Sequence, residues 1–223
     1  MTKALFFKEW LKIKWSFWSM VALAALLLIK LALNISYSIR LMGANNFWYH
    51  NTVQGGIFYS DFVYFFAFAA LVFAIAQYMP EITDDRLKLT LHLPMAENTI
   101  LISMIFFGTM MFFVVYFLTA ASLVGIVASH FPNEVVRSVC LTILPWGAAG
   151  LVVYWAAAAI FVERIWIKRI FLIIITALYV SNLLSANNFQ IYDRVIVYFI
   201  FLSLLFSIAI IYTGHRYRKG VRK

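Results

Sequence analysis

The chain has 223 residues, of which 65% are hydrophobic and 12% are charged, whereas soluble domains average about 45–50% apolar and about 25% charged residues. Together with a mean hydropathy of +0.91, this composition excludes an ordinary soluble domain and predicts an integral membrane protein. The formal net charge of +9 does not indicate nucleic-acid binding, because the cations lie mostly between apolar runs. The single cysteine, Cys140, excludes an intramolecular disulfide and a Cys-based zinc site, and its apolar neighbours predict a small core residue.

The segment before the first long apolar run is expected to be an amphipathic helix over residues 1–14. Four apolar residues recur at spacings of four, three and four, so they share one helical face. We expect this face to lie in the acyl boundary while the charged residues point to anionic headgroups. The alternative is a basic flank that only sets topology. The apolar set is Phe6, Trp10, Ile13 and Phe17, and the charged set is Lys8, Glu9 and Lys12.

Six apolar runs are candidates for spanning helices, which need about 20 mainly apolar residues. The first is long enough to span and no small-residue cleavage motif follows it, so we expect a retained helix rather than a signal peptide. The fold class is therefore an all-α integral membrane domain of six transmembrane helices over residues 1–223. The expected spans are 15–34, 58–79, 99–128, 136–161, 169–184 and 195–213.

Glycine, proline and alanine inside these runs predict how the helices pack. Pro145, with Gly147 and Gly150, predicts a kink in the fourth span. Small residues let helices approach closely, and Gly108, Gly125 and the run at 156–159 are placed for this.

The distribution of Lys and Arg predicts the orientation. With both termini inside, the cytoplasmic segments hold fourteen of them and the external segments three, a strong positive-inside bias. We therefore expect a multi-pass protein of the inner or plasma membrane with cytoplasmic N and C termini. The three external cations are Arg40, Arg137 and Arg194, and Lys30 lies within the first span.

Motifs for catalysis or cofactor binding are missing from the sequence. There is no GxxxxGK[ST] phosphate loop, no HExxH metal motif and no GxSxG nucleophile elbow. We assign no catalytic residue, no metal ligand and no cofactor to this chain. Lys30 and Asp61 lie near the outer ends of their spans, and no run of buried acidic residues suggests a proton-coupled carrier.

Residues 80–98, PEITDDRLKLTLHLPMAEN, form a charged island between the second and third spans, on the expected cytoplasmic side. Its leucines recur both at helical spacing and in alternation, so a short helix and a strand both remain open. Pro94 disfavours helical geometry at Leu93 and ends the element there. A segment this short and this rich in charge and leucine suits docking rather than catalysis.

In its N-terminal segment and in residues 80–98, the chain resembles the permease subunits of type 2 ABC exporters, which have the type V ABC fold. The stretch that resembles the amphipathic elbow helix of that family is Lys8-Glu9-Trp10-Leu11. The stretch that resembles the family's cytoplasmic loop runs from Glu81 to Arg86 and on through LKLTLHLP. The topological resemblance covers nearly the whole chain, and the residue-level resemblance covers these two stretches. The sequence departs from the family pattern at 84–88, where Asp-Asp-Arg-Leu-Lys replaces the usual small or Gly-Thr element.

The resemblance implies that residues 80–98 are a coupling helix that fits a cleft on a separate ATPase. It implies as partners an ABC ATPase dimer, which would hold ATP and Mg, a second permease subunit of the same or a homologous kind, and membrane lipid. A non-transporting membrane anchor and, less favoured, an intramembrane lipid-modifying enzyme remain as alternatives. The substrate is open. The residues that would dock on the ATPase are Glu81, Asp84, Asp85, Arg86, Leu87, Leu89 and Leu91.

Overall fold

The computed structural model describes residues 2–43, 46–49, 57–83, 97–185 and 195–218. Within these ranges the chain is helical and contains no strand. The elements are α1 (Thr2–Met42), η1 (Ser60–Phe62), α3 (Phe65–Thr83), α5 (Glu97–Ala128), α6 (Asn133–Val162), α7 (Trp166–Leu184) and α8 (Ile196–Arg218).

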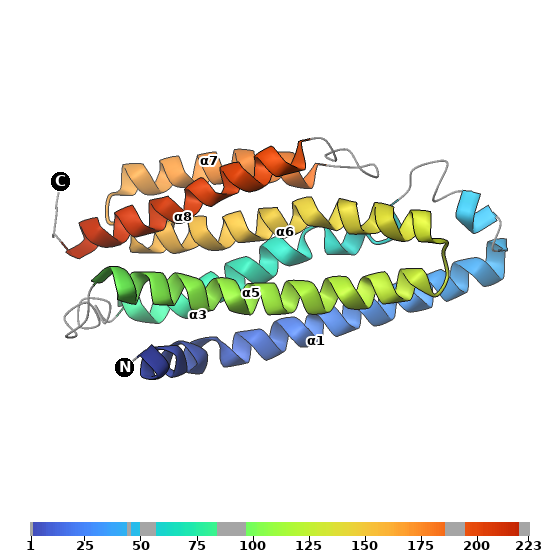
Figure 1. Cartoon of the computed structure of the whole chain (residues 1–223), viewed down its shortest axis with the longest axis horizontal. Helices are drawn as coiled ribbons and strands as arrows, with labels where there is room; N and C mark the ends of the chain where they lie inside the picture. The colour runs from blue at the N-terminus through green and yellow to red at the C-terminus, as the bar shows by residue number, and fades with distance from the viewer. Residues whose placement is uncertain (1, 44–45, 50–56, 84–96, 186–194, 219–223) are drawn as a thin grey trace.

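The long helices lie side by side in an elongated bundle (Figure 1). The start of α1, the ends of α3, α6 and α8 and the start of α5 all lie at one end of it, which we call the terminal end. In the described part of the chain, five helices are long and apolar enough to cross a membrane, and Ile196–Ile210 is a shorter apolar helix. The molecule is therefore an all-helical protein of membrane-spanning character.

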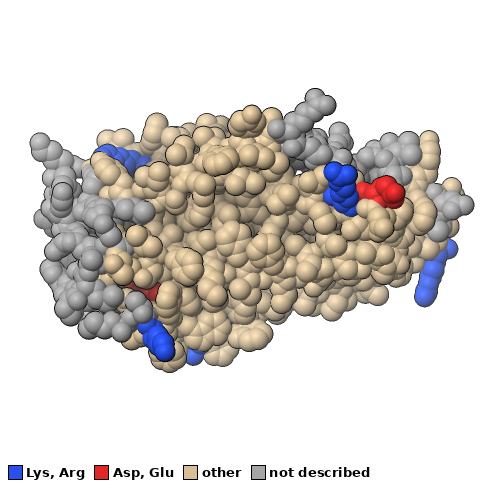
Figure 2. All heavy atoms as spheres, viewed as in Figure 1, with Lys and Arg blue, Asp and Glu red and all other residues tan. Residues whose placement is uncertain are grey.

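Charged side chains are scarce along the middle of one face of the bundle. On the face drawn in Figure 2, the coloured Lys, Arg, Asp and Glu residues lie near the two ends, and an uncharged band separates them. Such a band is what a hydrocarbon layer about 30 Å thick requires of the surface that faces it.

Helix α6 is the centre of the fold. It packs against α3, α5, α7 and α8, while α1 packs on α3 and α5. Its alanines at 156–159 are buried, as the packing prediction requires. Gly147 and Gly150 lie against the rings of Tyr116 and Phe112, where an added Cβ would overlap the ring atoms. Pro145 lies inside α6, which continues as a helix on both sides of it.

Helix α1 corrects the expected N-terminal arrangement. It is one continuous helix, so the expected interfacial segment and the first span are not separate elements. The face assigned to lipid packs inward: Ile13 is fully buried, and Phe6, Trp10 and Phe17 pack against the core. Glu9 is buried as well. Helical spacing shows which residues share a face, but not whether lipid or protein covers that face. The exposed apolar side chains of this region are Phe7, Leu11, Trp15 and Trp18.

Two local features also differ from expectation or were not foreseen. Cys140 is exposed rather than part of the core.

At the turn from α6 to α7, Oε1 of the buried Glu163 accepts hydrogen bonds from the backbone N–H groups of Arg164 and Ile165 at 3.0 and 3.1 Å. Glu163 therefore satisfies backbone donors just before α7 begins, a local role that spacing could not reveal.

Aromatic rings close the bundle at the end opposite the termini. Phe131, after α5, stacks on Phe58 with ring centroids 5.1 Å apart and lies 5.7 Å from the buried Phe47. Tyr59 continues this packing to Trp146 of α6 at 5.6 Å. Phe47, which lies between the first and second expected spans, thus packs on the protein itself.

Candidate functional site

A cluster of two lysines and two glutamates joins α1 to α3 near the terminal end. Lys12 Nζ lies 2.6 Å from Glu9 Oε1 and 2.5 Å from Glu81 Oε1. Lys8 Nζ lies 2.8 Å from the same oxygen of Glu81. Both glutamates are almost fully buried, at 2% and 1% exposure. The four formal charges cancel, and this balance allows carboxylates to remain in an apolar bundle.

The cluster continues across the bundle through Gln77 of α3. Gln77 Nε2 donates to Glu9 Oε2 at 2.9 Å and to the backbone oxygen of Met104 on α5 at 2.8 Å. Its Oε1 accepts a hydrogen bond from the Tyr154 hydroxyl of α6 at 2.6 Å. Both amide donors and the amide oxygen of this buried side chain are therefore used. One polar network connects α1, α3, α5 and α6.

Gly108 of α5 makes room for this network. A Cβ built on Gly108 would overlap the Tyr154 hydroxyl and Gln77 Oε1, and would lie 2.5 Å from Tyr154 Cζ. The predicted close approach at this glycine is thus confirmed. At Gly125 the described residues make no such approach, because none of them outside the adjoining turns of α5 places an atom within 4 Å of an added Cβ.

Of the predicted docking residues, the described part of the chain contains only Glu81. It lies inside the bundle and is bound to α1. Asp84, Asp85, Arg86, Leu87, Leu89 and Leu91 lie outside the described residues.

The structure brings three predicted residues, Lys8, Glu9 and Lys12, into contact with Glu81 or with one another, although the sequence placed them in two separate groups. Sequence reasoning missed Gln77 and Tyr154. The available signal was Gln77 itself, an amide within the apolar run 65–79.

The arrangement of the cluster suits mechanical connection rather than bond-making chemistry. Its contacts between α1 and α3 join residues 68 and 69 apart in sequence, and the Tyr154–Gln77 hydrogen bond joins residues 77 apart. Among the residues that the structure describes, no group of three or more His, Cys, Asp or Glu side chains could hold a metal ion.

No family model matches this chain, and no curated protein or solved structure is significantly similar to it.

Proposed function

We propose that the chain is the permease subunit of an ATP-driven ABC exporter. It forms half of a translocation path and couples to a separate ATPase through residues 80–98. Six spans, with the terminal end in the cytoplasm, give this loop access to a cytoplasmic partner. The ATP and Mg belong to that partner, and a second permease completes the path.

The observation that carries the proposal is the position of Glu81. It lies three residues before Asp84, where the charged island continues beyond α3, and Lys8 and Lys12 bind it to α1. Lys12 also binds Glu9, which Gln77 links to α5 and α6. A force applied to the loop would reach four helices through these contacts. Rigid-body movement of helices is the usual way in which such a force changes access to a path.

Charge and leucine substitutions in the loop test this proposal. We expect Leu89→Asp and Arg86→Glu to lower the amount of ATPase that co-purifies by about tenfold or more, as for loss of an interface anchor. The measurement is affinity purification in mild detergent with identification of partners, followed by substrate-stimulated ATPase activity.

The matched control is Arg222→Glu, which makes the same charge reversal on the same expected side but outside the loop. It should leave the co-purified ATPase unchanged. Normal association and transport in both loop variants would refute the coupling assignment. A bound ATPase whose activity never responds to any exported compound would favour the anchor subunit instead.

A further inference from the structure

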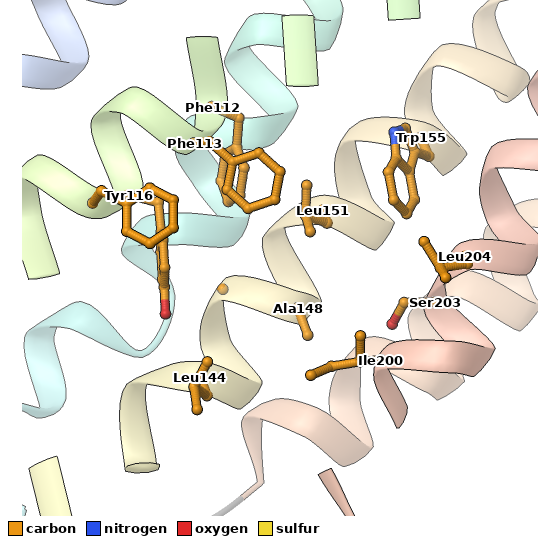
Figure 3. A pocket seen from close by; sticks show the side chains of 12 residues that line it. Phe112, Phe113, Tyr116, Leu144, Ala148, Leu151, Trp155, Ile200, Ser203 and Leu204 are labelled. Carbon is orange, nitrogen blue, oxygen red and sulfur yellow. The ribbon is translucent and has the colours of Figure 1, made fainter. Parts of the chain in front are cut away.

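A groove runs between α5 and α8, with α6 as its floor. Figure 3 shows Phe112, Phe113 and Tyr116 of α5 on one side, Ile200, Ser203 and Leu204 of α8 on the other, and Leu144, Ala148 and Leu151 of α6 between them. This hollow has a volume of about 230 Å³. A second hollow of about 250 Å³ adjoins it toward the terminal end, and Trp155 lines both.

The lining residues form continuous stripes along the helices. Those of α5 recur every three or four residues from Ile102 to Phe117, and those of α8 do so from Ile200 to Ser207. Fifteen residue steps along α5 correspond to about 22 Å at the rise of an α-helix. One leaflet contributes about 15 Å, half of a hydrocarbon core about 30 Å thick. Taken together, the two hollows extend far enough along α5 to accommodate a complete acyl chain of one leaflet.

The chemistry of the lining favours a hydrocarbon chain. Four of its five polar side chains have hydrogen-bond partners within the described part of the protein, the exception being Tyr116: Trp155 Nε1 donates to Thr109 Oγ1 at 3.0 Å, Ser203 Oγ to the backbone oxygen of Phe199 at 2.8 Å, and Ser207 Oγ to that of Leu204 at 2.7 Å. A polar ligand would lose its hydration without gaining these groups as partners. A chain of methylene groups would gain dispersion contacts with the aromatic rings.

Positive charge beyond one end of the groove indicates that the lipid headgroup is anionic. After Ser207, α8 continues toward the terminal end and carries Arg216 and Arg218 in its last turn. Basic residues next to a bilayer attract anionic lipids, by about 1 kcal/mol each. We propose that the α5–α6–α8 groove binds one acyl chain of an anionic glycerophospholipid, whose headgroup lies at the basic end of α8. This site is independent of the proposed ATPase coupling, and measurements of lipid binding alone test it.

The test uses the full chain in detergent micelles and phosphatidylglycerol that carries a photoreactive diazirine on one acyl chain. Mass spectrometry locates the labelled peptides. We expect saturable labelling of the groove faces of α5 and α8, with competition by unlabelled phosphatidylglycerol. Leu204→Trp fills the groove from α8 and should lower this labelling about tenfold, the factor equivalent to about 1.4 kcal/mol. Leu144→Trp fills the groove from α6 and should lower the labelling by a similar factor.

The matched control is Leu178→Trp on α7, an equally large change at a side chain that is 62% exposed and does not line the groove. It should leave labelling of α5 and α8 unchanged. Replacing Arg216 by Gln should reduce the preference for phosphatidylglycerol over phosphatidylcholine about fivefold.

Three outcomes would overturn the proposal. Even labelling of α1, α7 and α8, insensitive to both groove-filling variants, would mean ordinary surrounding lipid. Equal saturable labelling by the two lipids would contradict the anionic headgroup. A dimer that blocks labelling and that Leu204→Trp dissociates would show that a second copy of the chain covers the groove.

Discussion

Replacing Lys12 with methionine is expected to lower the free energy of unfolding by about 3–5 kcal/mol, the usual cost of removing one partner from a buried charge pair. Lys12 is the only cation within 4 Å of Glu9 in the described structure, and it shares Glu81 with Lys8. Its loss leaves two buried carboxylates with one lysine, which is itself 37% exposed. Unfolding by titration with a denaturing detergent, followed by circular dichroism, measures the change.

The matched control for this prediction is the Lys30–Asp61 pair. Its atoms are 2.7 Å apart, but its side chains are 56% and 44% exposed. Because exposed pairs contribute about 0–1 kcal/mol, Lys30→Met should have a small effect. An equal loss in the two variants would contradict the importance of burial.

A second variant separates lost charge from lost packing. In the double variant Glu9→Gln with Lys12→Met, the remaining carboxylate is that of Glu81, which keeps its ion pair with Lys8. No buried charge is then left without a counter-ion. We expect this double variant to recover more than half of the stability lost in Lys12→Met. Failure to recover would show that the aliphatic stem of Lys12, rather than its charge, is what the bundle requires.

Gly108→Ala is expected to destabilise the protein by about 1–3 kcal/mol, the usual cost of overpacking. The new methyl group would occupy the space of the Tyr154 hydroxyl and of Gln77 Oε1, so the hydrogen bond between them would have to break or move. The same unfolding titration measures this effect.

Gly125→Ala is the control, since it makes the same change in the same helix where nothing lies within 4 Å. There the alanine should be neutral or should stabilise α5 by up to about 1 kcal/mol, because glycine is a poor helix former. Combining Gly108→Ala with Tyr154→Phe should cost less than the sum of the two single changes, because both disturb one contact. Additive costs would contradict the steric explanation.

The position of the buried cluster gives these effects a functional context. Gln77 lies six residues before the end of α3 at Thr83, which is about 9 Å along the helix axis. The network is therefore nearer to the terminal end of α3 than to its other end, on the side of the expected cytoplasmic loop. In the proposed permease, variants that weaken it should fold less stably and also transmit loop movement less well.

The long apolar helices of the structure agree with the membrane class that the composition predicts. Apolar runs of spanning length are visible in the sequence because a lipid-facing helix must be apolar along its whole length, and this condition is local. Five of the six expected spans correspond to helices of sufficient length and hydropathy. The helix that contains the first expected span, α1, extends beyond it at both ends, from Thr2 to Met42.

The orientation of each helix about its own axis could not be read from spacing. Phe6, Trp10, Ile13 and Phe17 do share a side of α1, yet that side packs against protein. In a membrane, lipid and a neighbouring helix are both apolar, so the hydrophobic pattern does not distinguish them. Trp15 and Trp18 are exposed instead, at 77% and 60%.

The apolar runs of the sequence predict an all-helical, membrane-spanning protein, and the sequence lacks the catalytic motifs sought. Only the tertiary structure brought Glu9, Lys12 and Glu81 together and added Gln77 and Tyr154 to them. The reason is physical. Membrane insertion depends on the local sum of transfer free energies, whereas a buried ion network depends on atoms that helix packing places within 3 Å across long stretches of chain.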